Sequence, residues 1–392
     1  MKKSQIFVTN KFVFPIAATV FTIFSYYLFF KQSIGIGYPS DWSAHLFFAI
    51  DKENSTGGGY SLMHQLVRLL PDAFQISKGT SYIEFANAAM VIIISLSNFW
   101  STIILRNYFK KFFTELNPIL CDFLPIALMM ISMLILHPTS SASHYIGSGS
   151  PNPWHNPTYI FSKPFALLVF LQTIYLFELQ KNKAPYFKSI LLLAIFSAIS
   201  MWAKPSFLLS FIPSVALYTL WGLVRKKLSF RFAVLLALSM SISLLPLYWI
   251  NRMVYMNSET YNQIIFAFAK VWRIHSINIP HSVLIGSAFP LFVFFIKRRK
   301  LSLISQLSII NFILAFLIYL FLAENGDRLY HANFSWTYMF SLFFIFVAAA
   351  REFLIEPSKV LIIRLLSWGL FLFHLLSGIY YFVLLLNGYS YQ

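Results

Sequence analysis

Long apolar runs alternate with short polar segments along the whole chain. A helix needs about 20 mostly apolar residues to cross roughly 30 Å of hydrocarbon, although packed or tilted spans can be shorter. The runs that fit are residues 13–30, 85–105, 118–136, 164–178, 189–203, 205–223, 232–250, 282–296, 302–322, 335–350 and 365–386. The pattern predicts an all-α, polytopic membrane protein with about 11 transmembrane helices, a single transmembrane domain over residues 1–392 and no soluble domain.

Basic residues gather in every second polar segment. Lys2, Lys3 and Lys11 precede the first run, and the densest later cluster is Lys297-Arg-Arg-Lys300. Because loops rich in Lys and Arg remain on the cytoplasmic side, the N-terminus is predicted to lie inside. The outer loops then comprise residues 31–84, 137–163, 251–281 and 323–334, and these hold most of the histidines.

Composition agrees with this pattern and narrows the range of partners. The chain of 392 residues is 58% hydrophobic and 11% charged, whereas soluble domains hold about 25% charged residues. Its net charge of +17 comes largely from the inner clusters, so membrane lipids are expected partners and nucleic acid is not. Cys121 is the single cysteine of the chain, which excludes an internal disulfide.

The first outer loop is predicted to contain two short interfacial helices. The first begins at Asp41, and His45 follows four residues later, which places both side chains on one face. The second covers residues 60–70 and is stopped by Pro71. An acid and an imidazole at a membrane surface favour chemistry. In the alternative interpretation Asp41 only caps its helix and His45 is hydrated.

The second outer loop is predicted to be rigid. Three prolines fix its backbone, namely Pro151, Pro153 and Pro157. Trp154, His155 and Asn156 are the candidates for stacking on a sugar ring and hydrogen-bonding to it. The alternative is a rigid plug whose tryptophan lies among the lipid headgroups.

Lys204 lies in a very short break between two apolar runs, directly before Pro205. No acid is near it in the sequence, and a charge in such a place favours a cavity or a bound anion. In the alternative interpretation its ammonium group only reaches up to the lipid headgroups. The near absence of a polar loop around Lys204 favours the anion.

The later outer loops supply five further candidates: Arg252, Arg273 and Arg328 for phosphate, and Glu324 and His331 for sugar or acceptor. Residues 261–272 have the apolar spacing of a helix, which would place Arg273 just past its end. In the last outer loop the acid, the arginine and the histidine are spaced to line one side of a short helix.

The layout from residue 1 to about residue 336 resembles that of GT-C-type integral-membrane glycosyltransferases. The shared features are an acidic residue after the first span, interfacial helices in the first loop, a Lys-Pro break and a polar last outer loop. Asp41 and Lys204 match at the level of motifs. The resemblance implies that a sugar is taken from a polyprenyl-phosphate carrier on the outer face of a membrane. The first loop lacks the adjacent acidic pair of metal-dependent members, and no C-terminal soluble domain follows.

Residue types suggest roles in such a transfer. Asp41, with His45 beside it, would be the base for the acceptor hydroxyl, and a single carboxylate implies inversion at the anomeric carbon. The cations that would bind the donor phosphate are Lys204, Arg252, Arg273 and Arg328. The side chains that would bind sugar or acceptor are Trp154, His155, Asn156, Glu324 and His331. Retention would require a second carboxylate near Asp41, for which Asp51 and Glu324 are candidates.

No cofactor is expected. A divalent metal held by His45, His155 and His331 is the less favoured alternative, because the sequence has no HxxxH or HExxH spacing. The expected partners are a polyprenyl-phosphate-linked sugar donor and a glycan, lipid or protein acceptor of the cell envelope. The expected location is a bacterial cytoplasmic membrane, with the active site facing outward.

Two other classes of protein also fit this pattern. A polymerase or ligase of lipid-linked polysaccharide would use outer-loop arginines and histidines and would not need Asp41. A lipid-sugar flippase or other transporter would show polar or broken spans near the membrane midplane, often in repeated halves. The sequence shows no convincing internal repeat, and its ionisable residues gather at one face, which makes a transporter the weaker alternative.

Overall fold

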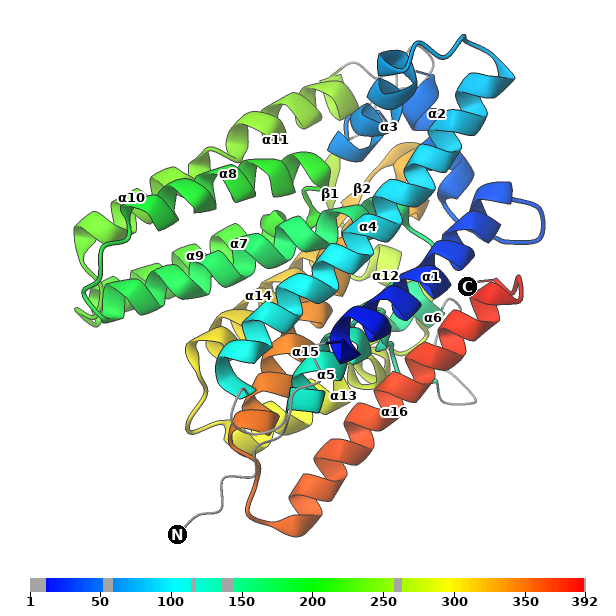
Figure 1. The fold of residues 1–392 in the computed structure, drawn as a ribbon. Helices are drawn as coiled ribbons and strands as arrows, with labels where there is room; N and C mark the ends of the chain where they lie inside the picture. Colours follow the sequence, from blue (N-terminus) through cyan, green and yellow to red (C-terminus); the bar gives the residue numbers. More distant parts are fainter. Residues whose placement is uncertain (1–11, 52–58, 114–117, 136–143, 257–262, 391–392) are drawn as a thin grey trace.

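A computed structural model describes residues 12–51, 59–113, 118–135, 144–256 and 263–390. The described chain is mostly helical (Figure 1). Within it, nine helices are long and apolar enough to cross a membrane, and two shorter apolar helices cover Leu120–Met130 and Phe187–Ala203. The protein is therefore an integral membrane protein of the all-α class. The predicted number of 11 spans and the predicted orientation stay predictions.

The helices of 19 residues or more are α1 (Val13–Ile34), α4 (Thr80–Phe113), α7 (Pro157–Lys181), α9 (Ser206–Val224), α13 (Ile279–Lys297), α14 (Leu303–Phe321), α15 (Ser335–Ile355) and α16 (Leu361–Leu386). The ninth candidate span, Phe230–Val254, is divided into two shorter helices. Shorter helices are α2 (Trp42–Ile50), α3 (Leu62–Ala73), α5 (Pro118–Met130), α6 (His144–Ser148), α8 (Phe187–Ala203), α10 (Phe230–Ser241), α11 (Leu244–Asn251) and α12 (Lys270–His275). The chain also forms a π-helical turn, η1 (Arg252–Met256), and a 3₁₀ helix, η2 (Gly326–His331).

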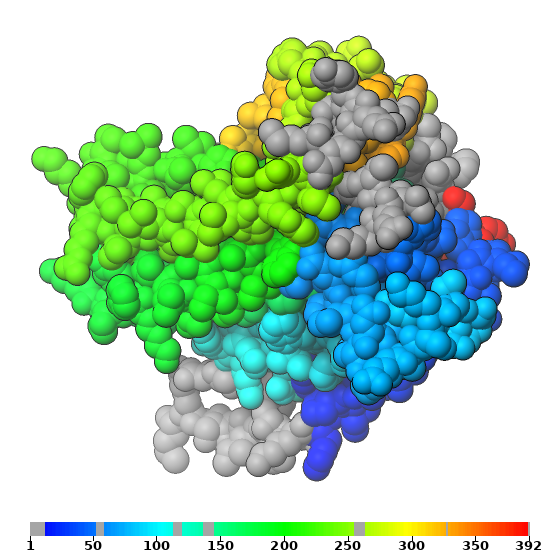
Figure 2. Space-filling view, turned by 90° about the horizontal axis from the view of Figure 1, so that it is seen from above, coloured from blue at the N-terminus to red at the C-terminus, as the bar shows by residue number. Residues whose placement is uncertain are grey.

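The core is built around α15, whose side chains are buried almost from end to end. It packs against α9, α13 and α14, while α4 packs between α1 and α7. Helix α8 packs against α7, α10 and α11. Helices α8, α10 and α11 belong to the lobe, green in Figure 2, that projects from the rest of the molecule. A helix that is apolar on every side needs neighbours all round, which explains why α15 is central.

Two chain breaks position the polar residues described below. Asn156 is the N-cap of α7: its side chain accepts a hydrogen bond from the backbone N–H of Tyr159, and Pro157 occupies the first helical position. Lys204 ends α8 in an extended conformation, with φ −165° and ψ 121°. Because a residue before proline is disfavoured in the α region, Pro205 enforces this break.

The two short helices predicted in the first outer loop are present as α2 and α3. Pro71 does not stop the second one, because α3 continues to Ala73. The proline removes one backbone hydrogen bond of the helix, but its ring is buried in the packed interior. Residues 52–58, between the two helices, lie outside the described residues.

The predicted helix over residues 261–272 is wrong. Residues 264–266 form strand β1 (Ile264–Phe266), which pairs antiparallel with β2 (Leu322–Glu324). A left-handed residue, Ala269, then precedes the short helix α12. The adjacent Ile264 and Ile265 are β-branched and favour a strand once a partner is present, and the partner lies in a distant loop.

Candidate functional site

Three segments that are far apart in the sequence meet at one end of the helices. They are the start of α2 with Asp41, the N-cap of α7 with Asn156, and the α8–α9 break with Lys204. The Asn156 Nδ2 group donates to Asp41 Oδ2 at 2.7 Å, and Asn156 Oδ1 accepts from Lys204 Nζ at 3.4 Å. The Asn156 carboxamide therefore joins the Asp41 carboxylate to the Lys204 ammonium group, and we call this arrangement the polar bridge.

Surrounding donors fix the orientation of the carboxamide in the polar bridge. Asn156 Oδ1 also accepts from the backbone N–H of Tyr159 at 2.8 Å and from the Thr158 hydroxyl at 2.9 Å. Lys204 Nζ donates to Thr158 Oγ1 at 2.8 Å. Because N–H donors face the oxygen and a carboxylate faces the nitrogen, a flipped amide would lose its hydrogen bonds with Asp41, with the Tyr159 N–H and with Lys204.

Asp41 is at the N-cap position of α2, but the structure, which describes all of α2, gives its side chain no capping hydrogen bond. Its backbone N–H instead donates to the His155 carbonyl at 3.1 Å, and its carboxylate faces Asn156. The side chain stays 30% exposed. The alternative in which Asp41 only caps the helix does not hold, and the carboxylate is open to a hydroxyl group.

Lys204 is almost fully enclosed, with 8% of its surface exposed. Its ammonium nitrogen lies 4.8 Å from the centroid of the Trp336 ring, a cation–π contact. Burial lowers the pKa of Lys204 to about 8, and the negative charge of Asp41 acts in the opposite direction. The lysine is therefore mostly protonated at neutral pH, and it responds strongly to any anion that approaches.

His155 and Trp154 form the wall behind Asp41 and do not face a sugar. His155 is 0% exposed, with Nδ1 3.3 Å from the Tyr381 hydroxyl and Nε2 4.0 Å from Asp41 Oδ2. Burial lowers the pKa of His155 to about 4, although Asp41 acts to raise it. Trp154 is 2% exposed and packs edge-on against Phe382. The expectation that these two rings bind a sugar directly is therefore corrected, because the prolines fold their loop inward.

His45 lies beside a residue that the sequence did not single out as a candidate. Its Nδ1 atom is 3.0 Å from His64 Nε2 of α3, and the two rings stack with centroids 5.2 Å apart. Burial lowers the pKa of His45 well below its usual value, and positive charge on His64 or Lys204 lowers it further. His64 could have been suspected from the predicted pair of neighbouring helices, but the register of the two helices is a tertiary property.

Lys204 also lines a cavity of about 510 Å³, here called the polar cavity. It lies between α9, α11, η2 and the start of α15, and its volume is typical of small-molecule sites. The polar side chains of its wall are Tyr60, Lys204, Ser206, Tyr248, Asn251, Glu324, Arg328 and Asn333. The rest of the lining is largely apolar and includes Leu209, Leu244, Leu247 and Ile250. The polar cavity is therefore amphipathic.

The spacing predicted that Glu324, Arg328 and His331 line one side of a short helix. The structure shows that they do not. Glu324 ends β2, and its Oε2 atom accepts from Arg328 Nε at 3.2 Å and from the side-chain amide of Asn333. His331 is exposed at the end of η2. Because Glu324 pairs with β1, it lies in a strand and not in a helix, and it forms a partly buried ion pair with Arg328 on the wall of the polar cavity.

The other two predicted phosphate-binding arginines lie elsewhere. Among the described residues that line the polar cavity, neither Arg252 nor Arg273 is included. Arg252 is exposed on η1, and Arg273 is exposed on α12 with its guanidinium 5.9 Å from the Phe268 ring. Trp272 is buried against Tyr319, so the neighbouring Arg273 is turned outward. Of the four predicted phosphate-binding cations, Lys204 and Arg328 therefore line the polar cavity, and Arg252 and Arg273 lie outside its described lining.

An apolar hollow of about 410 Å³ lies next to the polar cavity, along the membrane-spanning helices. It lies between α9 and α10, and Leu244 lines both hollows, so the two are neighbours. Leu209, Ile212, Thr219 and Leu223 mark a single face of α9 along the two hollows. We call the second hollow the α9–α10 groove. From Ser206 to Leu223 the helix rises about 25 Å, which is close to the thickness of the hydrocarbon core.

Comparison of the sequence with protein-family models and with curated proteins gives no match. The chemistry of the site must therefore be argued from its geometry. It combines a partly exposed carboxylate, a buried cation joined to it by a carboxamide, a cavity lined by that cation, and an apolar groove next to the cavity. Such a site is suited to a ligand with an anionic head and a long hydrocarbon chain.

Proposed function

We propose that the protein is a membrane glycosyltransferase that moves a sugar from a polyprenyl-phosphate carrier to an acceptor of the cell envelope. The observation that carries the proposal is the polar bridge, which joins Asp41 to a cation at the mouth of an amphipathic cavity. We place the site on the outer face of a bacterial cytoplasmic membrane, because basic residues concentrate in the opposite set of loops.

The donor would lie along the two neighbouring hollows. Its phosphate would lie in the polar cavity beside Lys204, with Arg328 on the same wall, and its chain would descend the α9–α10 groove. A buried cation interacts with phosphate more strongly than an exposed one does, because little water screens the charge. The Glu324 partner limits the net charge of Arg328, so Lys204 is the main cation for the phosphate.

The proposed reaction is a single displacement. The acceptor oxygen forms a bond to the anomeric carbon while Asp41 takes the hydroxyl proton, and the bond between that carbon and the phosphate oxygen breaks. The electron pair leaves with the polyprenyl phosphate, whose charge Lys204 stabilises. The polar bridge contains one carboxylate, and Glu324 is held by Arg328 and Asn333. This arrangement supports inversion of the anomeric centre.

The decisive experiment replaces Asp41 with asparagine and measures sugar transfer from a polyprenyl-phosphate donor by purified protein in lipid. We expect Asp41→Asn to abolish transfer, because an amide cannot take the proton, while the protein remains folded. Asp72→Asn is the matched control, since Asp72 is an exposed carboxylate of α3 that accepts from Tyr82. Full activity in Asp41→Asn would contradict the mechanism and favour a polymerase or ligase that needs no base at this position.

A further inference from the structure

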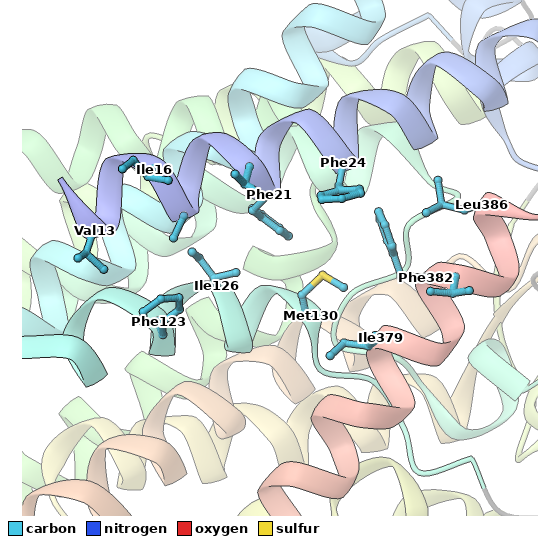
Figure 3. Close-up of a pocket in the computed structure, with 13 residues that line it drawn as sticks. Val13, Ile16, Phe21, Phe24, Phe123, Ile126, Met130, Ile379, Phe382 and Leu386 are labelled. Carbon is cyan, nitrogen blue, oxygen red and sulfur yellow. The ribbon is translucent and has the colours of Figure 1, made fainter.

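Two further hollows differ in what they can recognise. The larger, of about 680 Å³, lies between α1, α5 and α16 (Figure 3), and its described lining carries apolar side chains only. Such a lining suits one hydrocarbon chain as well as another, so it identifies no ligand. The other, of about 490 Å³, is lined by Lys297, Arg298, Arg299, Lys300 and Glu356, together with Phe295 and Ile296. We call it the basic cavity.

The basic cavity lies far from the polar bridge. Helix α15 begins beside the bridge, where Trp336 contacts Lys204, and Glu356 directly follows its last residue, Ile355. From Trp336 to Ile355 the helix rises about 29 Å, which is close to the thickness of the hydrocarbon core. The basic cavity therefore belongs to the opposite membrane surface, where the basic loops predict the cytoplasm.

The turn that carries the four basic residues is fixed at both ends by carboxylates. At its start the Lys297 ammonium group donates to the backbone carbonyl of Glu356 and lies 3.4 Å from the carboxylate of the same residue. At its end Glu352 Oε1 accepts from the Ser302 backbone N–H at 3.1 Å and from the Ser305 hydroxyl at 2.8 Å. Glu352 is buried. The two acids thus hold the backbone of the turn in place before any ligand binds.

The charges of the basic cavity are not balanced within the protein. Glu356 offsets the charge of Lys297. In the part of the chain that the structure describes, no carboxylate forms an ion pair with the other three basic residues, Arg298, Arg299 and Lys300, and all three are exposed. The cavity therefore has a surplus of three positive charges on a fixed turn. An anion with more than one negative charge would offset their mutual repulsion.

The apolar part of the lining favours a lipid as the source of that anion. Phe295 and Ile296 lie on the last turn of α13, a candidate membrane span, and are 63% and 37% exposed. The Phe295 ring also lies 4.9 Å from the guanidinium of Arg298, so apolar surface and cation adjoin. A soluble anion would use the charges alone. A phospholipid would use both parts, because its chains lie along the helix while its phosphates reach the turn.

We infer that the basic cavity binds a membrane lipid whose head carries two phosphate groups, of the diphosphatidylglycerol type. Two phosphodiesters match the surplus charge better than the single phosphate of phosphatidylglycerol does. The cavity volume of about 490 Å³ is that of a small-molecule site. The bound head would join the α13–α14 turn to the segment after α15 and so stabilise the fold at this surface. The inference does not depend on the proposed function.

The first test is a titration of the purified full-length protein in detergent with diphosphatidylglycerol, followed by native mass spectrometry. The double variant Arg299→Gln, Lys300→Gln removes two of the three surplus charges. Because each basic residue at an anionic lipid head contributes about fivefold in affinity, the Kd should rise about 25-fold. The matched control, Arg225→Gln, Lys226→Gln, removes the same two charges from an exposed turn after α9, outside the described lining of the basic cavity. It should change the Kd less than about twofold.

Three competitors identify the source of the phosphate. Phosphatidylglycerol, with one phosphate, should bind at least about fivefold more weakly than diphosphatidylglycerol. Phosphatidylcholine, which has no net charge, and inorganic pyrophosphate, which has no chains, should not displace diphosphatidylglycerol at equal concentration. Displacement by pyrophosphate would assign the cavity to a soluble anion, and equal affinity for phosphatidylglycerol would show that a second phosphate is not recognised. Either result overturns the inference, and both use the wild-type protein, so neither depends on the folding of a variant.

Thermal unfolding in detergent gives an independent measurement. Diphosphatidylglycerol should raise the unfolding temperature of the wild-type protein, because a ligand that binds the folded state stabilises it. Arg299→Lys, which keeps the charge, and the α9 control should retain this shift, whereas the Arg299→Gln, Lys300→Gln variant should lose most of it. An equal loss in the control would mean that the lipid responds only to the net charge of the protein, and it would overturn the inference.

Discussion

Lys163 and Lys204 are two buried lysines whose partners come from the same stretch of chain, yet their surroundings differ. Lys163 is 2% exposed, and its Nζ atom donates to the Asn152 side chain and to the Pro151 carbonyl at 3.4 Å. The Phe343 ring lies 4.5 Å from the ammonium and closes another side. Lys204 also contacts an asparagine, but it lines the polar cavity and is joined through Asn156 to an acid.

The difference shows what a buried charge must have in order to act on a ligand. Asn152, the partner of Lys163, also donates to the Leu128 and Ile131 carbonyls at the end of α5. Lys163 therefore fastens α5, the proline-rich loop and α7 together, and it is not among the described residues that line the polar cavity or the α9–α10 groove. Both lysines are buried. Lys204 differs from Lys163 because it lines a cavity that a ligand can enter and because an acid, Asp41, lies near it.

The largest effect is expected from Lys204→Met. Loss of one charge that stabilises a leaving group typically lowers turnover about a hundredfold or more, and donor binding should fall less than turnover does. Lys204→Arg should restore activity only in part, because the planar guanidinium needs more room beside Trp336 and Thr158. The measurement is turnover and donor affinity in lipid-reconstituted protein. Normal turnover in Lys204→Met would show that this lysine has no role at the phosphate.

The matching change at the other lysine should affect stability and leave the chemistry intact. Lys163→Met leaves the buried Asn152 and Pro151 oxygens without this donor, which should cost about 1–3 kcal/mol of folding free energy. Thermal unfolding in detergent should therefore begin at a lower temperature, while turnover per folded molecule stays within about twofold. A loss of turnover like that of Lys204→Met would erase the proposed distinction between the two lysines.

Asn156→Ala tests the polar bridge itself. The change removes the hydrogen bond to Asp41, the contact with Lys204 and the N-cap of α7. Loss of a cap costs about 1 kcal/mol of stability. We expect turnover to fall by about tenfold, since both charged groups remain but their relative position is no longer fixed. Asn152→Ala is the matched asparagine change, and equal turnover in the two variants would contradict a special role for the bridge.

The sequence predicted the local features of the fold and much less of the candidate site. Apolar runs predicted long helices such as α1 and α14, and the spacing after Asp41 predicted α2, because these patterns depend on neighbours in sequence. The polar bridge joins residues 115 and 48 positions apart, and no local pattern reports such a contact. Polar residue types identified Asn156 as a candidate, but its role as a link between Asp41 and Lys204 emerges only from packing.

The errors have the same physical origin. Trp154 was expected to meet a sugar because its loop is polar, yet Phe21 and Phe382 from two membrane-spanning helices enclose it. The helix expected over residues 261–272 was replaced by a strand because β2 supplied hydrogen-bonding partners from a distant loop. In both cases long-range contacts override the local tendency.

The smallest effect is a pH dependence that also separates the two lysine sites. Because the pKa of Lys204 is about 8, kcat/KM should fall above that pH, to about half of its maximum at the pKa. A bound donor phosphate raises the pKa of Lys204, so the fall in kcat itself should occur at a higher pH. His155, whose pKa is about 4, stays neutral above pH 5 and adds no fall on the acid side.

The fall in kcat/KM above pH 8, here called the alkaline limb, cannot arise from unfolding caused by the titration of Lys204. Its pKa is about 8 in the folded protein and 10.5 for a free lysine, so between these values the unfolded chain binds more protons than the folded one. Stability contributed by this group therefore rises with pH across that window. Lys204→Arg should abolish the alkaline limb, since arginine keeps its proton to pH values above about 12. An unchanged limb in Lys204→Arg would assign it to another group and would leave the polar bridge without its titrating cation.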